Sequence, residues 1–322
     1  MMPVLVRPYA MRMHWDNKLT QEHFTIAELS SELLPEMTNI AKRQLVYDDI
    51  SEELIQEKSF ASPDFDSELS LGCFCDNVLA GYLVGISKPN DMAWIRLMTV
   101  HPDYANRGAG SLLLSTFEKV VANRGVKTVS VGDSTPNYLM PGMDYRYTAG
   151  WCFLKKNGYY LVHTNQNLIA PIKPSFWPEL PKQIEQLAAD NIIVRRATAD
   201  DMKSLLPLLE TLWPGWIIEV KNTFDNSPIS TFVAVTISGE YLGFSSYQGN
   251  NKCLPWFGPI GTSPLARGKG IGGCLFRLCL LEMAKQGFDS TIIPWVGPVR
   301  FYVNYSNAKI DRAFYVLRKT FE

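Results

Sequence analysis

The hydrophobic and polar positions follow the same order in both halves of the chain. Residues 93–100 form a β-rich run that precedes a proline turn, a glycine loop and an amphipathic helical pattern, and residues 254–262 precede the same series. Gly108 in the first glycine loop and Gly270 in the second are 162 residues apart, about half of the chain. The pattern therefore indicates a tandem duplication.

A proline-rich segment separates the two copies. Its prolines, at positions 171, 174, 178 and 181, stand too close together for a helix or a central strand before Lys182. We therefore expect a linker at residues 171–190 between domains at 1–170 and 191–322. A length of 322 residues agrees with two domains, because domains usually contain roughly 100 to 200 residues.

The composition is typical of a soluble globular protein, with 46% hydrophobic residues, 20% charged residues and a net charge of -1. Residues 1–190 hold 17 basic and 22 acidic residues, whereas residues 191–322 hold 14 basic and 10 acidic residues. The second half is therefore the better host for a phosphate-bearing ligand. Because the chain has no tract of Lys and Arg, its sequence does not predict nucleic-acid binding.

The sequence also predicts a cytoplasmic protein with no membrane partner. Pro3, Arg7 and Pro8 interrupt any apolar core of a signal peptide near the N-terminus. No apolar run reaches the ~18 residues that a membrane-spanning helix needs. The cysteines form no C-x-x-C pair, and no His, Cys or acidic residues have metal-ligand spacing, so we expect reduced thiols and no metal.

The second glycine loop, residues 264–273 (PLARGKGIGG), has the chemistry to bind a pyrophosphate. Glycines let the backbone approach a ligand closely, and the first turn of the following helix leaves its amides unpaired. The helix dipole also favours an anion at this end. Arg267 and Lys269 would add charged donors. The loop could instead serve only to begin the helix.

A dinucleotide-binding loop is a further alternative, because Gly268, Gly270 and Gly273 satisfy the G-x-G-x-x-G spacing. Several residues separate the first of these glycines from the preceding strand pattern, whereas the dinucleotide motif follows its strand directly. The copy in the first half has Leu113 where the third glycine of that motif belongs. These departures count against the dinucleotide interpretation.

A threonine-x-proline followed by R-x-x-G-x-G at a strand-to-helix junction, here Thr262 to Gly272, resembles the acetyl-coenzyme A loop of the GCN5-related N-acetyltransferases (GNATs). The resemblance extends roughly over residues 24–170 and 192–322, and its loop motif is stronger in the second half. It implies an α/β (α+β) fold of two tandem GNAT domains. Each would be a splayed mixed β-sheet flanked by helices.

The resemblance also implies that acetyl-CoA is the co-substrate, with its thioester arm in the splay between the fourth and fifth strands. The matching positions in the second half are Ile260, Thr262, Arg267, Gly268, Lys269, Gly270, Ile271 and Gly272. In the first half they are Met98, Val100, Arg107, Gly108 and Gly110.

Acetyl transfer to an amine requires a neutral amine, stabilisation of an oxyanion and a proton for the departing thiolate. The resemblance implies that Tyr302 is the acid, although Tyr302 could be a packing aromatic and Tyr305 is a rival acid. Glu219 and Asp225 are candidates for the base, and each could instead be a surface charge. A chain of water molecules without a side-chain base is a further possibility.

Two aromatic residues border these candidates. Trp213 and Trp216 follow the first helical pattern of the second half and would either wall the acceptor pocket or anchor their loop in the core. No histidine of the second half can be the base, because all four histidines precede residue 171.

Two substitutions indicate that the second domain is catalytic and the first is degenerate. Aligning Gly108 with Gly270 puts Ala105 opposite Arg267, and counting back from Gly158 puts Leu154 where the acid tyrosine would stand. A leucine cannot donate a proton.

The sequence thus predicts an acetyl-CoA-dependent N-acetyltransferase that acts on the primary amine of a small molecule by direct attack. The alternative is a non-catalytic acyl-CoA-binding sensor or regulatory module of the same fold. We expect a monomer with an internal pseudo-dimer. The sequence leaves the acceptor open among aminoglycosides, amino acids, polyamines, amino sugars and a protein substrate.

Overall fold

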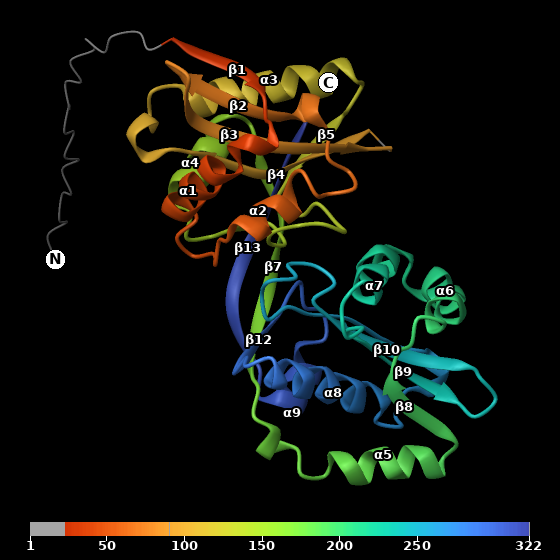
Figure 1. Ribbon diagram of the computed structural model, residues 1–322. Helices are drawn as coiled ribbons and strands as arrows, with labels where there is room; N and C mark the ends of the chain where they lie inside the picture. The colour runs from red at the N-terminus through yellow and green to blue at the C-terminus, as the bar shows by residue number, and fades with distance from the viewer. Residues whose placement is uncertain (1–22, 90, 322) are drawn as a thin grey trace, which may run out of the picture.

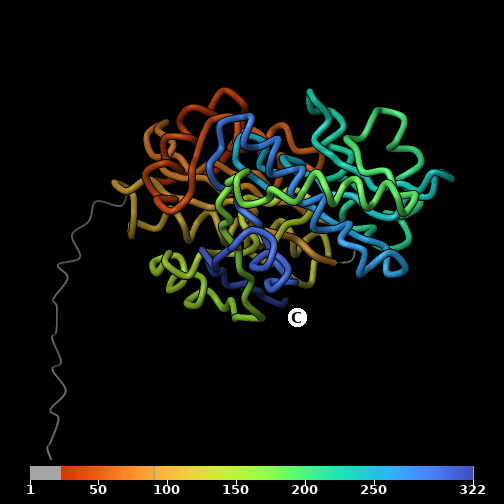
Figure 2. The backbone as a smooth tube through the Cα atoms, turned by 90° about the horizontal axis from the view of Figure 1, so that it is seen from below, coloured from red at the N-terminus to blue at the C-terminus, as the bar shows by residue number. Residues whose placement is uncertain are grey.

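The computed structural model describes residues 23–89 and 91–321 as two lobes joined by long strands (Figure 1). The N-terminal residues for which the sequence predicts no signal peptide lie outside this description. Seen from below in Figure 2, the red and orange segments of the first half gather on one side, and the cyan segments of the second half gather on the other. No helix within the described residues is long and apolar enough to cross a bilayer.

The first half contains seven strands and four α-helices within the described residues. The strands are β1 (Phe24–Glu28), β2 (Ser70–Cys75), β3 (Val78–Lys88), β4 (Met92–Val100), β5 (Thr128–Val131), β6 (Met143–Asp144) and β7 (Tyr160–Pro171). The helices are α1 (Leu34–Gln44), α2 (Glu52–Lys58), α3 (Ala109–Asn123) and α4 (Thr148–Lys156).

The second half repeats this order after one additional helix and without a counterpart of β6. Its strands are β8 (Ile192–Arg196), β9 (Thr231–Thr236), β10 (Tyr241–Tyr247), β11 (Phe257–Thr262), β12 (Ser290–Ile293) and β13 (Lys309–Thr320). Its helices are α5 (Leu180–Ala189), α6 (Asp201–Leu212), α7 (Ile217–Phe224), α8 (Ile271–Lys285) and α9 (Val299–Ser306).

The two halves exchange their last strands. β7 and β13 pair antiparallel over most of their length at the centre of the molecule. Residues 317–320 of β13 then pair with β5 of the first half, and residues 168–171 of β7 pair with β12 of the second half. The sheet therefore crosses the domain boundary that the sequence predicts between 170 and 191. The sequence does not reveal this exchange, because strand alternation indicates which face is buried but not which strand is the neighbour.

The sheet opens differently in the two halves. In the first half, β4 and β5 form a parallel ladder over four residues of each strand. In the second half, only one bridge, between Trp256 and Ile292, joins the corresponding region before β11 and β12 diverge. As a result β8–β11 form a separate four-stranded sheet with the order β11-β10-β9-β8. The wider opening lies in the second half.

The segment 171–190 contains helix α5 and is anchored to the second core at Ile172, Trp177, Leu180 and Leu187, while most of its other residues are exposed. Helix α5 begins at Leu180, within the predicted linker, because Pro181 stands in the first turn, where a missing N–H does not break a helical bond. Its apolar positions Leu180 and Leu187 lie seven residues apart on one face and are buried against the second core. Helix α8 is thereby covered on the side away from the sheet, which explains its largely apolar sequence.

Candidate active site

A cavity of about 1020 Å³ fills the opening between β11 and β12. Its walls come from β11, the glycine loop, the start of α8, helix α9, and the loop that leads into α7. Residues of the first half complete it from the other side, since Thr135 and Tyr138 also line it. The wide splay of the second half therefore contains a cavity to which both halves contribute.

The glycine loop at this cavity is shaped by two left-handed residues. Gly268 and Gly270 have φ angles of 83° and 80°, and a Cβ atom at either position would meet nothing within 4 Å. The glycines are therefore needed for backbone conformation and not for lack of space. Gly270 begins α8 without a side-chain cap, so the first amides of that helix remain available to a ligand.

Most of the predicted cofactor positions of the second half line the cavity. These are Ile260, Thr262, Arg267, Gly268, Gly270, Ile271 and Gly272. Lys269 is exposed and does not line this cavity, and its role as a charged donor stays a prediction. The backbone turns at the glycines on both sides of Lys269, and the pattern of the sequence alone did not show on which side its side chain would lie.

Glycines in α8 also let helix α9 approach closely. The ring of Tyr305 lies so near Gly273 that a Cβ atom there would be 2.1 Å from it, and the Phe301 ring is 3.5 Å from the corresponding point on Gly272. Any larger residue at Gly273 would displace Tyr305. The glycine run thus positions α9 as well as the loop.

Both tyrosines that the sequence offers as the acid lie at the cavity. Tyr302 is 6% exposed and packs edge-on against Phe276 and Phe301, and its burial raises the pKa of the phenol well above its usual range. Tyr305 stands one turn further along α9, with the guanidinium of Arg277 4.9 Å from its ring. Because Tyr302 stays protonated at ordinary pH, it can act as a hydrogen-bond donor.

Glu219 is buried at the same cavity. The carboxylate comes from α7, and the residue is only 8% exposed. Burial raises the pKa of the Glu219 carboxyl to about 8, and the neighbouring Lys58 ammonium limits that rise. Asp225, the other candidate, is exposed at the end of α7 and lines neither described cavity. The surface-charge interpretation therefore fits Asp225 and not Glu219.

The two tryptophans anchor their loop in the core and also line the cavity. The rings of Trp213 and Trp216 are stacked 5.8 Å apart and meet the fully buried Phe244 edge-on. A Cβ atom on Gly261 would be 2.7 Å from the Trp213 ring, so the ring lies directly on β11. Both tryptophans also line the cavity. They anchor the loop and form the wall at once.

Sequence reasoning missed the residues that the first half contributes. Tyr138 is 5% exposed and packs between Trp256 and Trp295, with ring centroids 6.1 and 5.4 Å away. It lies on the connection of 16 residues between β5 and α4, which includes β6, whereas the equivalent connection between β12 and α9 has five residues. This difference between the two copies was the available signal that the longer loop has an additional role.

The loop of the first half keeps the backbone conformation of the second loop. Asn106 and Gly108 adopt left-handed angles, as Gly268 and Gly270 do. Asparagine tolerates this conformation better than most residues. The predicted cofactor positions around this loop line neither described cavity; they are Met98, Val100, Arg107, Gly108 and Gly110.

Contacts of the helices support the predicted correspondence between Leu154 and Tyr302. The Phe153 ring lies beside Gly110 in the first half, just as the Phe301 ring lies beside Gly272 in the second. The next residue is Leu154 in one copy and Tyr302 in the other, and both are buried. No group of His, Cys, Asp and Glu side chains in the described part of the chain is arranged to hold a metal ion.

Comparisons with known proteins agree with this geometry. Residues 34–139 match the model of the acetyltransferase (GNAT) family. The match lies in the first half, although the loop motif is stronger in the second. No curated protein sequence matches the chain.

Solved structures with the same fold cover nearly the whole chain. One is described as a GCN5-related glucosamine N-acetyltransferase region of a fungal multi-domain GH3 β-N-acetylglucosaminidase, with a TM-score of 0.76, 15% identity and 94% of this chain covered. This chain spans 38% of that protein.

Two others match over almost their full lengths. A GCN5-related N-acetyltransferase from Sphaerobacter thermophilus has a TM-score of 0.67 and 16% identity, with 92% of this chain and 95% of that chain covered. A tandem GNAT protein from the clavulanic acid biosynthesis pathway has a TM-score of 0.63 and 13% identity, with 92% and 98% covered. Residues 34–139 thus match the GNAT family, and the chain as a whole has the fold of these structures, one of which is described as a tandem GNAT protein.

Proposed function

We propose that the chain is an acetyl-CoA-dependent N-acetyltransferase whose second half acetylates the primary amine of a small molecule. The observation that carries this proposal is one cavity that is lined by the glycine loop, Tyr302 and the buried Glu219. A sensor of acyl-CoA would need the loop. It would have no evident need for a buried carboxylate and a buried phenol at the same opening.

The residues present suit acetyl-CoA. The amides at the start of α8 and the Arg267 side chain can bind a pyrophosphate, and the splay beside β11 offers an apolar channel for an extended arm. When bound there, acetyl-CoA supplies an acetyl group activated as a thioester.

Glu219 and Tyr302 then have complementary tasks. Glu219 takes a proton from the acceptor ammonium, which leaves the nitrogen lone pair free to attack. A C–N bond forms and the C–S bond breaks, and Tyr302 donates its proton to the departing sulfur. The second proton of the nitrogen replaces the one that Tyr302 has lost. The net products are an amide, a thiol and one proton.

The acceptor proposed first for testing is an amino sugar. The structural neighbour described as a glucosamine N-acetyltransferase region has the same fold across this chain. The cavity is also bounded by two tryptophans and Tyr138, and aromatic faces are common walls of pockets for small organic ligands.

A thiol-release assay with acetyl-CoA and a panel of amines tests the proposal. We expect turnover in the wild type and a loss of at least about a hundredfold in Glu219→Gln, the lower range for removal of a general base. Asp225→Asn is the matched control, because it removes an exposed carboxylate at the end of the same helix. If acetyl-CoA binds but no amine of the panel causes release of the CoA thiol, the sensor is favoured.

A further inference from the structure

The candidate active-site cavity combines a single acidic group with aromatic walls. Glu219 and Arg267 are the only charged residues among the described residues that line it, and Arg267 belongs to the loop that suits a pyrophosphate. Four of the eight tryptophans of the chain line the same cavity. The surroundings of Glu219 therefore decide what kind of ligand the rest of the cavity can take.

The Glu219 carboxylate has no hydrogen-bond partner of its own. The residue is only 8% exposed, and within residues 23–89 and 91–321 no group donates a hydrogen bond to its carboxylate or forms an ion pair with it. A buried carboxylate without such a partner is costly, and a bound cation would offset that cost. Because Glu219 lines the cavity, a ligand in the cavity can supply this cation.

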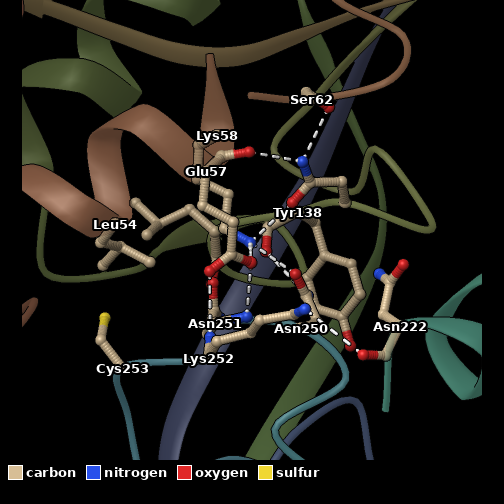
Figure 3. Close-up of polar contacts among 12 residues, drawn as sticks. Leu54, Glu57, Lys58, Ser62, Tyr138, Asn222, Asn250, Asn251, Lys252 and Cys253 are labelled. Atoms are coloured by element: carbon tan, nitrogen blue, oxygen red, sulfur yellow. Dashed lines mark hydrogen bonds and ion pairs between the residues drawn. The ribbon is translucent and has the colours of Figure 1, made fainter. Parts of the chain in front are cut away.

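The cation that influences Glu219 is engaged elsewhere (Figure 3). Lys58 is fully buried, and its Nζ donates to Glu57 Oε1 at 2.7 Å, to Asn137 Oδ1 at 2.7 Å and to Asn250 Oδ1. A neutral amine has only two N–H bonds, so three acceptors require the ammonium form. Since the Glu57 carboxylate balances the Lys58 ammonium, the negative charge of Glu219 remains uncompensated.

Two tryptophans lie beside the carboxylate on its own helix. Trp216 stands three residues before Glu219, at the start of α7, so the two side chains lie on one face. The ring of Trp213 stacks on Trp216 with the ring centroids 5.8 Å apart. Both tryptophans line the cavity and are only partly buried. They thus present ring surface to a ligand at Glu219, and the face of a tryptophan ring attracts cations.

Tyr138 brings a third ring from the first half. Burial raises the pKa of its phenol, and the charge of Glu219 raises it further, as expected for groups that lie close together. The Trp295 ring meets the Tyr138 ring edge-on at 5.4 Å. Tyr138 is held in place across the halves, because the side-chain amide of Asn250 donates to its carbonyl at 3.0 Å. Rings from both halves therefore border Glu219.

The backbone of Trp295 is strained in favour of this arrangement. Its φ angle is 47°, in the left-handed region that bulky residues rarely adopt. The backbone N–H of Trp295 donates at 3.0 Å to Oδ1 of Asn167, a residue of β7 that is 1% exposed. Strain of this kind persists where the surrounding structure fixes it, and it is concentrated at ligand sites. The position of the Trp295 ring therefore fits a role in ligand binding.

We propose that this cavity recognises the acceptor as an ammonium ion, through Glu219 and the surrounding aromatic rings, and that it also binds quaternary ammonium ions. This inference rests on the proposed function, because it concerns the acceptor before Glu219 takes its proton. The nitrogen of a quaternary ion has no proton to give and no lone pair for attack. Such an ion therefore occupies the site without reacting at nitrogen.

Choline and a neutral alcohol of the same shape test the recognition of charge. The alcohol is dimethylbutanol with a terminal tert-butyl group, which replaces the trimethylammonium group of choline. We expect the wild type, saturated with CoA, to bind choline at least about tenfold more tightly than this alcohol in calorimetry. The proposal fails if choline does not bind or if the alcohol binds as tightly.

A charge variant locates the choline site at Glu219. Glu219→Gln keeps the shape of the side chain and removes its charge, so we expect choline to bind at least about tenfold more weakly. Asp225→Asn is the matched control, because it removes an exposed carboxylate at the end of the same helix. Equal affinity for choline in the wild type and in Glu219→Gln would overturn the assignment.

A ring variant tests the aromatic wall. Trp216→Leu is expected to weaken choline binding by about threefold, and its unfolding transition, followed by circular dichroism, shows whether the variant is folded. Trp151→Leu is the matched control, because Trp151 lines neither this cavity nor a second cavity of about 830 Å³ between α2 and α7. Equal losses in the two variants would show that the ring at position 216 has no particular role.

Kinetics separate failure of this inference from failure of the proposed function. Choline should raise KM for whichever amine of the panel is acetylated, without lowering kcat. If choline binds through Glu219 but no amine is acetylated, the ammonium site stands and the proposed function fails. If amines are acetylated while choline neither binds nor inhibits, the proposed function stands and the ammonium site fails.

Discussion

The two halves share a loop backbone but differ in what surrounds it. Each has a strand, a short turn of 3-10 helix that begins with proline, and a left-handed residue that starts the long helix. In the first half the sheet stays paired for four residues, and Ala105 and Leu154 occupy the positions of Arg267 and Tyr302. In the second the sheet opens and a cavity follows.

This comparison shows that backbone conformation and chemistry can change separately after a duplication. The first half retains the loop, whose residues 105–108 are exposed, while its loop after β5 packs against the second half through Tyr138. The proposed catalytic groups belong to one copy, and the wall around them comes from both. Matched substitutions at equivalent positions of the two halves test this difference.

The largest effect is expected from separating the halves. Residues 191–322 expressed alone lack β7, which supplies the neighbour of β12, and residues 1–190 alone lack β13, which supplies the neighbour of β5. We expect neither fragment to show a cooperative unfolding transition by circular dichroism, because each would expose an unpaired strand edge. Co-expression of the two fragments should restore the transition. A cooperative transition in either fragment alone would show that its sheet is complete without exchange.

Exchanging the side chains at the two equivalent helix positions should give the next largest effect. Tyr302→Phe is expected to lower kcat by about a hundredfold, the lower range for loss of a general acid, with little change in acetyl-CoA affinity. Leu154→Phe changes the equivalent position of the first half and should leave kcat unchanged. Wild-type turnover in Tyr302→Phe would transfer the acid role to Tyr305 or to water.

Removal of the loop cation should also affect the second half and not the first. Arg267→Ala is expected to weaken acetyl-CoA binding by about tenfold through loss of a charge-assisted hydrogen bond. Arg107→Ala, in the first loop, should leave the affinity of the second half unchanged. Isothermal titration calorimetry measures both. Equal losses in the two variants would show that the first loop also binds acetyl-CoA.

The smallest effect concerns pH and links the two halves. Glu219 accepts a proton only when ionised, so kcat/KM should rise with pH around the pKa of about 8 that burial gives this carboxyl. The Lys58 ammonium favours the ionised form of Glu219, and because burial lowers the pKa of Lys58 to about 8, this support is lost as the pH rises through that value. Lys58→Met should therefore raise the pKa of Glu219 further and move the rise of kcat/KM to higher pH.

The pH profile of kcat/KM is measured with two acceptors whose amines differ in pKa. A rise that stays at the same pH with both acceptors belongs to the enzyme, and a rise that moves with the pKa of the amine belongs to the substrate. Glu219→Gln should remove the rise that belongs to the enzyme in both the wild-type and the Lys58→Met background. An unchanged rise in Lys58→Met would mean that the first half does not influence the base.

Local features of the site could be predicted from the sequence, whereas contacts between the halves could not. Gly268, Gly270 and Arg267 follow from a short motif, because a left-handed turn before a helix is encoded by adjacent residues. Tyr302 follows from its position in the next helix. Glu219 remained ambiguous, because its burial and the charge of Lys58 beside it arise from the folded structure and are not visible in the neighbouring sequence.

Lys58 and Tyr138 could not be identified from spacing, because they belong to the first half and lie near the candidate active site of the second half only in the folded structure. The predicted domain ends were also incomplete descriptions of the sheet. Strand patterns such as 309–320 show that a segment is extended, but both β5 and β7 are compatible neighbours. The single strong clue was the longer loop of the first copy, and its meaning depends on seeing which half it contacts.

The exchanged strands have a consequence for the synthesis of the protein. β5 is made less than halfway along the chain, yet the strand that covers its free edge is made almost two hundred residues later. While the ribosome translates the second half, the first half must wait with an open sheet edge, a state that favours aggregation. The folding of this protein is therefore expected to depend on the rate of translation and on chaperones that cover such edges.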